Sequence, residues 1–233
     1  MRLDRFLTRH TTHTRNEVKH LLSSNRVTVF GEIEQDSHRE ISEFTEVALD
    51  GEILQKREAI YLMLHKPEGY LSATHDPKHP TVIDLIDHPH RSELHLAGRL
   101  DRASTGLLLL TNDGKWSRKV TEPAEEIFKI YRITTRDPIS EETAAIFEQG
   151  IYFAFEDLTT RPAQLEILTP HQALLSIHEG RYHQVKRMFH AVGNKVLTLH
   201  RESIGPLMLD PNLAPGQFRS LTALEIAHFC GRL

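Results

Sequence analysis

The sequence contains a single cysteine, Cys230, among its 233 residues. One cysteine excludes an intramolecular disulfide framework and a four-cysteine zinc site, and it fits a reducing compartment. Long hydrophobic runs are also missing, since the unbroken apolar segments are far shorter than the roughly 20 residues of a membrane helix. The first residues contain no apolar core of the kind found in signal peptides. We therefore expect a cytoplasmic protein without a membrane segment.

An excess of positive charge is absent as well. The formal net charge is −4 with the 16 histidines counted as neutral, which is not the bulk basicity typical of nucleic-acid-binding proteins. Contacts with a nucleic acid must therefore come from local basic patches. Hydrophobic residues (39%) and charged residues (26%) occur in the proportions of an ordinary globular protein, so a sizeable core in one or two domains is expected.

Several motifs that bind metals or nucleotides are missing. The chain has no His-Glu-x-x-His or Cys-x-x-Cys pattern, and the loop that contains His88, His90 and His95 has few acidic residues, so we predict no metal site. The glycine-rich patterns that bind dinucleotides or triphosphates are absent too.

The first 57 residues are typical of a small separate domain. Apolar residues at helical spacing begin at Leu3, and Thr14 with Glu17 predicts a capping box before a second short helix. A strand at 26–29 and a hairpin turned by Asp50-Gly51 follow. Up to Arg26 the domain contains six Arg or Lys residues against two acidic ones. This basic surface is either an ordinary solvated helix face or a phosphate-binding face.

Residues 58–233 are predicted to form a second domain with an α+β fold and a mixed, largely antiparallel sheet, because strands and helices alternate without a strict βαβ rhythm. Strands are expected at 60–64, 107–110, 129–135, 165–168, 173–177 and 196–200, and helices at 141–149 and 182–192. Thr222 and Glu225 predict a last capped helix whose residues Leu224, Ile226 and Phe229 point inward.

Asp101 is the most informative acidic residue. It lies in a loop between Arg99 and Arg102, and the all-leucine run 107–110 follows almost at once. The apolar run predicts a buried strand, which places the carboxylate at a fixed point beside a rigid element. Nearby cations favour the ionised form of a carboxylate and attract polyanions. A nucleophile that acts on a nucleotide needs such a setting.

A second basic group lies at the start of the helix expected over 182–192. The apolar stripe of this helix faces the core, so its cations fall at the edges of the stripe or outside it. They are Arg181, His183, Lys186 and Arg187. They form either an anion site or a surface salt-bridge network with Asp101. Tyr131 lies in the strand expected over 129–135, where an aromatic side chain is ordinarily half-buried for structural reasons alone.

The segment Gly98–Gly106, which begins Gly-Arg-Leu-Asp, closely resembles the catalytic motif of the RluA/RsuA superfamily of pseudouridine synthases. The turn at Lys66-Pro67, the Lys129-x-Tyr131 strand and the Gly180–Met188 segment occur in the order of that superfamily. The first domain resembles an S4 RNA-binding domain, which is typical of the RsuA family, and Gly180–Met188 is similar to the members that modify small-subunit ribosomal RNA. One departure is His65, where many relatives have Asn.

The resemblance implies a site-specific isomerisation of a uridine in small-subunit (16S) ribosomal RNA to pseudouridine, without a cofactor. It assigns Asp101 as the nucleophile, Tyr131 as the ring that stacks on uracil, and Lys186 as the ion-pair partner of Asp101. Arg181 is the nearby competitor for that pairing. Arg99 matches a residue that fills the space left by the extruded base.

The expected partner is small-subunit ribosomal RNA, free or within an assembling particle, and a monomer is expected. The S4-like domain would bind folded RNA through phosphate contacts and shape. The predicted RNA contacts are Arg99, Arg102, Arg181, Arg187, Arg2, Arg5, Arg15, Lys19 and Arg26. Two alternatives stay open: a large-subunit synthase of the same family, and a non-catalytic S4-type RNA-binding protein. The joint presence of Asp101, Tyr131 and Lys186 argues against the second.

Overall fold

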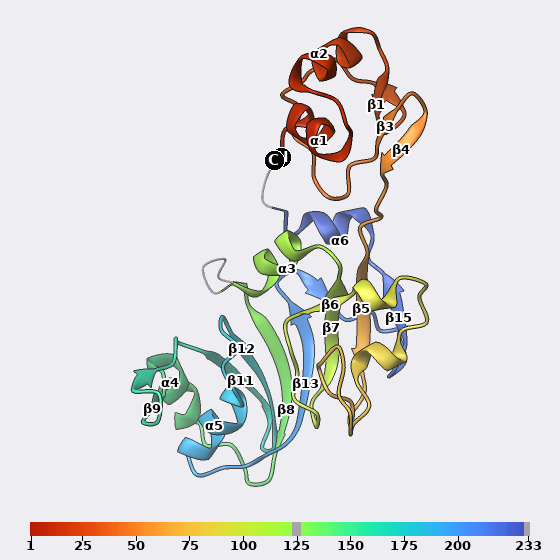
Figure 1. The fold of residues 1–233 in the computed structure, drawn as a ribbon. Coiled ribbons are helices and arrows are strands. Elements are labelled where there is room, and N and C mark those ends of the chain that lie inside the picture. The colour runs from red at the N-terminus through yellow and green to blue at the C-terminus, as the bar shows by residue number, and fades with distance from the viewer. Residues whose placement is uncertain (123–126, 231–233) are drawn as a thin grey trace. The chain divides into compact units, whose positions relative to one another are not determined.

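The computed structural model describes residues 1–122 and 127–230 of the chain. The chain divides into two compact units, Met1–Ala59 and Ile60–Leu233, and Figure 1 colours them from red to orange and from orange to blue. We call them the N-terminal unit and the C-terminal unit. Within the described residues, no helix is both long enough and apolar enough to cross a membrane.

The N-terminal unit contains two helices and a four-stranded antiparallel sheet with the strand order β2-β1-β3-β4. The predicted capping box is present, since the Thr14 side chain accepts from the Glu17 amide while Glu17 accepts from the Thr14 amide. The predicted hairpin turn is present as well, with left-handed backbone at Asp50 and Gly51. The elements are α1 (Leu3–His10), α2 (Arg15–Ser23), β1 (Val27–Val29), β2 (Glu32–Ile33), β3 (Val47–Leu49) and β4 (Glu52–Gln55).

The N-terminal unit has a hydrophobic core of its own. Leu3, Phe6 and Leu7 of α1 pack with the apolar residues of α2 and with β1 and β3, and all three are almost fully buried. The helical spacing of these residues in the sequence therefore correctly predicts which face of α1 is buried. The basic residues of both helices are left on the opposite, solvated faces.

The C-terminal unit is built on a nine-stranded sheet whose main path runs β11-β12-β8-β13-β7-β5-β15. Strands β6 and β14 pair with β7 and β13 beside this path. A separate two-stranded ribbon joins β9 (Tyr152–Phe153) and β10 (Leu158–Thr159). The sheet strands are β5 (Tyr61–Lys66), β6 (His95–Ala97), β7 (Thr105–Thr111), β8 (Lys129–Thr135), β11 (Gln164–Thr169), β12 (Gln172–Ile177), β13 (Val196–Ile204), β14 (Leu207–Met208) and β15 (Phe218–Ser220).

Among the described pairings of this sheet, all are antiparallel except that of β7 with β13, which is parallel. The prediction of a mixed, largely antiparallel α+β fold is therefore confirmed. The helices of this unit are α3 (Gly114–Thr121), α4 (Glu142–Gln149), α5 (Gln184–Ala191) and α6 (Ala223–Ala227), with 3-10 turns η1 (Val82–Leu85) and η2 (Arg91–Glu93).

Strand β7 is covered on both faces, which explains its uninterrupted leucines. Successive side chains of a strand point to opposite faces. Leu107 and Leu109 pack into one cluster with Trp116 of α3, whereas Leu108 and Leu110 pack into another under η1. A strand buried on both faces reads as a continuous apolar run rather than an alternating one.

The parallel pairing of β7 with β13 brings two backbones into close contact at Gly106. A Cβ atom at this position would lie 2.3 Å from the carbonyl oxygen of Arg201, and the φ angle of Gly106 is +106°. Only glycine satisfies both conditions. This contact fixes the start of β7 against the middle of β13.

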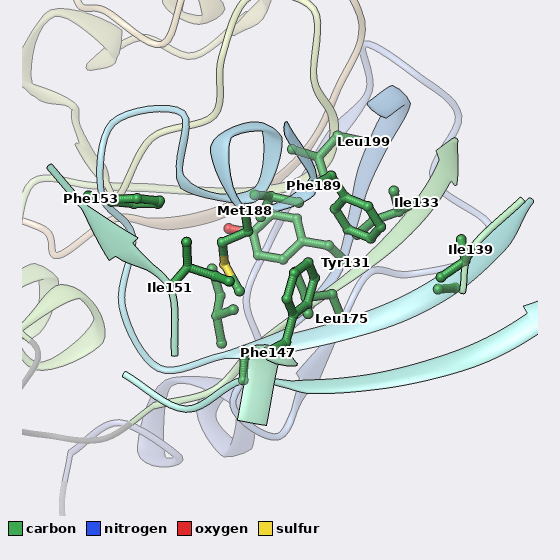
Figure 2. Packing of buried hydrophobic residues seen from close by; sticks show 14 of the residues in the cluster. Tyr131, Ile133, Ile139, Phe147, Ile151, Phe153, Leu175, Met188, Phe189 and Leu199 are labelled. Carbon is green, nitrogen blue, oxygen red and sulfur yellow. The ribbon is translucent and has the colours of Figure 1, made fainter. Parts of the chain in front are cut away.

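Helices α4 and α5 build the core over strands β8 and β12, as Figure 2 shows. Phe147 of α4 and Phe189 of α5 meet edge to face with their ring centroids 5.1 Å apart. Met188 lies beside them, and Tyr131 of β8 joins the same cluster. Burial of this apolar stripe orients α5 so that its opposite edge faces away from the core.

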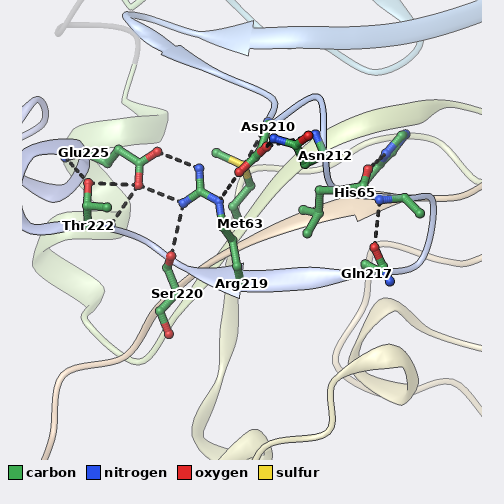
Figure 3. A network of polar contacts seen from close by, with 11 residues as sticks. Met63, His65, Asp210, Asn212, Gln217, Arg219, Ser220, Thr222 and Glu225 are labelled. Carbon is green, nitrogen blue, oxygen red and sulfur yellow. Dashed lines mark hydrogen bonds and ion pairs between the residues drawn. The ribbon is translucent and has the colours of Figure 1, made fainter.

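The C-terminal segment is held to the sheet by a polar network around Arg219 of β15, drawn in Figure 3. Arg219 donates to Asp210 at 2.7 Å and to both carboxylate oxygens of Glu225 at 2.8 and 2.9 Å. Glu225 also accepts from the Thr222 amide in the predicted capping box. The paired guanidinium and the cap lower the pKa of Glu225 to about 2.

Two local predictions are wrong. Helix α5 begins at Gln184 rather than Tyr182, because His183 has left-handed backbone angles (φ 49°, ψ 28°) that a helix cannot contain. Leu224 is 78% exposed instead of inward-facing. Helix α6 has five residues, and its packing is made by Phe229 and Ile226 against the core.

Candidate active site

The loop that contains Asp101 connects β6 to β7, and the side chain of Lys66 binds its backbone. The Lys66 side chain is fully buried. Its Nζ atom donates to the backbone carbonyls of Pro67 at 3.0 Å, Arg102 at 3.3 Å and Ser104 at 2.7 Å. Burial lowers the pKa of Lys66 to about 8, while the charge of Asp101 acts in the opposite direction. The carbonyls of Arg102 and Ser104 fix the segment that follows Asp101, and the carbonyl of Pro67 ties this segment to the turn after β5.

Two further contacts fasten the loop to the turn that follows β5. The Ser72 hydroxyl donates to the Leu100 carbonyl at 2.6 Å and accepts from the Leu100 amide at 3.0 Å. The Gly69 amide donates to the Arg102 carbonyl at 2.9 Å, and the Arg102 side chain donates back to the Gly69 carbonyl at 3.0 Å. The backbone on both sides of Asp101 is therefore positioned by hydrogen bonds before any substrate binds.

The Asp101 carboxylate points toward α5, where two side chains meet it. Lys186 Nζ lies 3.0 Å from Oδ2, and His183 Nε2 lies 3.5 Å from Oδ1. The Asp101 side chain is 25% exposed, so the carboxylate is sheltered but open to a ligand. The ion pair that the sequence predicts between Asp101 and Lys186 is present. The second contact comes from His183, one of the four cations for which the sequence leaves open a salt-bridge network with Asp101.

Tyr131 lies on the opposite wall of the same pocket. This pocket is lined by Asp101, Tyr131, Lys186 and His183, together with Arg99 and Arg181. Tyr131 is 6% exposed, so it is more deeply buried than the half-buried position expected for an aromatic residue in a strand. The structure therefore brings together the three residues to which the sequence assigns the chemistry, from β8, the Asp101 loop and α5.

Arg201 is a central residue of this region that sequence reasoning misses. Although charged, it is 2% exposed, and within residues 1–122 and 127–230 no ion pair neutralises it. It donates to the carbonyls of Leu107 at 2.7 Å and Arg99 at 3.3 Å, and its Nη1 lies 3.5 Å from the Tyr131 hydroxyl. Arg201 thus ties Tyr131 to the loop that holds Asp101. In the sequence, Arg201 is a charged residue that directly follows the strand predicted over 196–200.

The interior behind Tyr131 is electropositive. Arg201 and Tyr131 line a second cavity with Lys129, whose pKa is lowered to about 8 by burial and by the nearby charge of Arg201. The Nη2 atom of Arg201 is buried and has no hydrogen-bond partner among the described residues. A cluster of buried cations beside an active-site pocket attracts a polyanion such as RNA.

The remaining cations near the pocket differ in how firmly they are held. Arg181 is paired with the buried Glu179, with Nε 2.9 Å from Oε2, and not with Asp101. Arg187 is paired with Glu156 and stacks on the Phe153 ring at 3.7 Å. Arg99 and Arg102 are exposed.

The basic residues of the N-terminal unit fall into two groups. Arg2 pairs with Asp4, and Arg26 pairs with Asp50. The other three predicted RNA contacts are exposed and form no side-chain ion pair within the described part of the chain; they are Arg5, Arg15 and Lys19. These three side chains are available to phosphate groups.

Across residues 1–122 and 127–230, no three His, Cys, Asp or Glu side chains gather in a way that could hold a metal ion. The polar groups that line the pocket with the Asp101 carboxylate include an ammonium, an imidazole, a phenol and two guanidinium groups. Such a set suits nucleophilic chemistry on an electrophilic carbon that is held against a ring.

The family model described as RNA pseudouridylate synthase matches residues 60–191. This chain belongs to the RNA pseudouridylate synthase family. The matched segment contains Asp101, Tyr131 and Lys186 themselves. Membership of an enzyme family argues against the alternative of a non-catalytic RNA-binding protein, and it identifies the chain as a pseudouridine synthase.

Similar proteins share nearly the whole chain. The ribosomal small subunit pseudouridine synthase A of Pseudomonas aeruginosa is 49% identical over 227 residues, which cover 97% of this chain and 99% of that protein. The protein of the same name from Escherichia coli is 47% identical over 228 residues, covering 97% and 99%. A crystal structure of a pseudouridylate synthase superposes with a TM-score of 0.71 at 41% identity and covers 97% of this chain and 98% of that one.

Proposed function

We propose that this pseudouridine synthase isomerises one uridine of small-subunit ribosomal RNA and that Asp101 is its nucleophile. The observation that supports the assignment best is the carboxylate of Asp101, 3.0 Å from Lys186 Nζ, in a pocket walled by Tyr131. The choice of small-subunit RNA rests on the names of the two relatives that align over almost their full length.

The reaction breaks the N1–C1′ bond of the uridine and forms a C5–C1′ bond in its place. Asp101 opens this sequence by attack either on C1′ of the sugar or on C6 of the base. The freed uracil then rotates so that C5 faces C1′. When the new bond forms, C5 loses its proton and N1 gains one, so the product is an isomer of the substrate. No electron is gained or lost, and no external group is transferred.

Lys186 and Tyr131 have separate roles in this proposal. The Lys186 ammonium lies against the carboxylate and stabilises its negative charge. The Tyr131 ring offers a flat face on which the uracil stacks while its bond to the sugar is broken. The target must leave its helix or loop to reach the pocket, and the exposed side chain of Arg99 fills the space that the base leaves.

We infer that the N-terminal unit is an S4-like RNA-binding domain. The exposed cations Arg5, Arg15 and Lys19 contact phosphates of the folded RNA. Arg99, Arg102 and Arg181 continue the contact around the pocket, whereas Arg187 is held by Glu156 and contributes less. We propose that the protein acts as a monomer. We propose the cytoplasm, where ribosomal RNA is assembled into particles, as the place of action.

Mapping of pseudouridines in ribosomal RNA tests this proposal. Cells that lack the protein are compared with cells that express the wild type or Asp101→Asn. We expect one pseudouridine of the small-subunit RNA to disappear, to return with the wild type and to stay absent with the variant. Loss of a large-subunit site instead would favour the large-subunit alternative. Treating naked RNA and isolated particles with the purified protein then identifies the form of the substrate.

A further inference from the structure

Tyr182 is an exposed aromatic residue next to the catalytic carboxylate. Its side chain is 77% exposed, in the short segment that links β12 to α5. One face of its ring lies on the His183 imidazole, with the ring centroids 3.9 Å apart and the planes inclined by 19°. The high exposure of Tyr182 means that its other face is open to solvent.

His183 connects this ring pair to the active site. Its Nε2 atom lies 3.5 Å from Oδ1 of Asp101, so the stacked rings begin at the carboxylate and extend outward. The backbone of His183 is left-handed (φ 49°, ψ 28°), a conformation that non-glycine residues adopt rarely and that clusters at functional sites. With this backbone His183 lies just before the first residue of α5, and its imidazole reaches Asp101.

The ring pair forms one side of an open groove that leads to Asp101. The groove is also lined by Arg99, Arg102 and Arg181. Arginines along a groove bind phosphates, and an exposed aromatic face among them binds a nucleobase. This combination recognises a single-stranded nucleotide rather than a duplex, because neighbouring base pairs cover both faces of a base inside a duplex.

We propose that the free face of Tyr182 stacks on the base of a nucleotide adjacent to the target uridine. This inference rests on the proposed function and extends it to the flanking RNA. The Tyr131 ring holds the uracil inside the pocket, and the Tyr182–His183 pair holds its neighbour at the entrance. We call the stacked pair of Tyr182 and His183 the platform. The neighbouring base must be unstacked from the target uracil, so the platform favours substrates in which both nucleotides leave the helix.

A double-mutant cycle between protein and RNA tests the platform. The RNA is a small-subunit fragment that spans the mapped uridine, with tritium at C5, so that release of tritium reports turnover. Full-length wild type and Tyr182→Ala are each assayed on the intact fragment and on two fragments with an abasic site directly 5′ or 3′ of the target. We expect Tyr182→Ala to raise KM about 5- to 150-fold on intact RNA, the range measured for one stacked base, with kcat changed less than threefold.

The abasic fragments separate stacking from a structural role. On the fragment that lacks the stacked base, wild type and Tyr182→Ala should have the same KM. An equal effect of Tyr182→Ala on all three fragments, or no effect on any, overturns the proposal. Tyr182→Phe should retain most of the affinity because it keeps the ring, and Tyr182→Leu repeats the cycle with a non-aromatic side chain of similar size.

A matched control comes from Phe155, which is 96% exposed and does not line the groove. Phe155→Ala should leave KM and kcat unchanged on every fragment. Failure of the proposed function has a different signature, because wild type would then release no tritium from the intact fragment. Turnover by wild type with no change in Tyr182→Ala contradicts the platform alone.

Discussion

Lys186, in the first turn of helix α5, has its Nζ atom 3.0 Å from Oδ2 of Asp101. Arg181, the other cation that the sequence places near this carboxylate, is paired with Glu179 instead. The two residues differ because Lys186 follows the buried Val185 on the helix, so its stem runs along the edge of the core to the pocket. Arg181 precedes the helix and is held by local contacts.

This difference predicts opposite kinetic effects of the two cations. Lys186→Met removes the positive charge beside the nucleophile, so we expect kcat to fall by at least tenfold with little change in RNA affinity. Arg181→Met removes a groove cation, so we expect weaker RNA binding with kcat within a few-fold of wild type. Single-turnover rates and filter-binding constants measure the two effects.

Thermal melts serve as the control for this pair, because Arg181→Met also leaves the buried Glu179 without its ion pair. The role assigned to Lys186 is wrong if Lys186→Met changes only affinity. The family of the enzyme does not depend on that outcome.

Asp101→Asn is expected to abolish pseudouridine formation, because an amide cannot act as the nucleophile. The variant is nearly isosteric, and the loop is held by contacts to backbone atoms from Lys66 and Ser72. RNA affinity should therefore stay within a few-fold of wild type and the melting temperature should hardly change. Readily measurable turnover by the pure variant would refute the nucleophile assignment.

Much of the fold could be predicted because local patterns determine it. The strands of the C-terminal unit are recognisable from runs such as Leu107–Leu110, whose two faces both meet apolar clusters. The capping boxes at Thr14 and Thr222 are encoded within four residues. The ion pair between Asp101 and Lys186 could be predicted because the resemblance to a known family assigns roles to two segments that are distant in the sequence.

Other features depend on contacts between distant segments and leave no local signal. Arg201 has the pattern of a solvent-facing strand residue, yet β7 covers it and it binds the carbonyl of Leu107. The backbone of Arg201 excludes a Cβ atom at Gly106. The start of α5 was misplaced because the left-handed backbone of His183 is set by its surroundings near Asp101, not by helix propensity.

The cations of the N-terminal unit should make separable contributions to RNA binding. A triple variant with Arg5, Arg15 and Lys19 changed to Gln removes three exposed charges, so the slope of log K against log salt should become shallower by about 2–3. The matched control changes Arg2 and Arg26 to Gln. Their charges are already engaged by Asp4 and Asp50, so the slope should change by less than one.

Deletion of residues 1–57 extends the same test. The core of the N-terminal unit is separate, so the remaining chain should still fold and show cooperative melting. Its RNA affinity should be lower and less dependent on salt than that of the full chain. Unchanged affinity and slope in the deletion would show that the resemblance to an S4 domain has no bearing on RNA binding.

The Arg219 network predicts a loss of stability in acid. The pKa of Glu225 is lowered to about 2 in the folded state, chiefly by the hydrogen bonds from Arg219, from a usual value of 4.5. A group with a depressed folded pKa stabilises the fold above its unfolded pKa, and this stabilisation is lost as the pH falls from 4.5 toward 2. Glu225→Gln should cost on the order of 2 kcal/mol at pH 7 and should reduce the acid dependence over this range. Urea denaturation at several pH values measures both, and an unaltered pH profile in the variant contradicts the role of Glu225.

Gly106→Ala should damage both stability and activity. The added methyl group would lie 2.3 Å from the Arg201 carbonyl oxygen and would also occupy a backbone with φ of +106°. Because β7 and β13 cannot separate without loss of their pairing at the centre of the sheet, we expect a loss of about 3 kcal/mol or more in the free energy of unfolding. Displacement of β7 would also move the loop that holds Asp101, so kcat should fall while the folded fraction stays measurable at low temperature.

Gly216→Ala is the matched control. Gly216 also has a positive φ, of +88°, but no atom lies within 4 Å of the position of its added Cβ. Backbone strain alone should cost Gly216→Ala only about 1–2 kcal/mol, with kcat unchanged. Equal losses in the two variants would mean that the close approach of β7 to β13 contributes nothing beyond the backbone angle of the glycine.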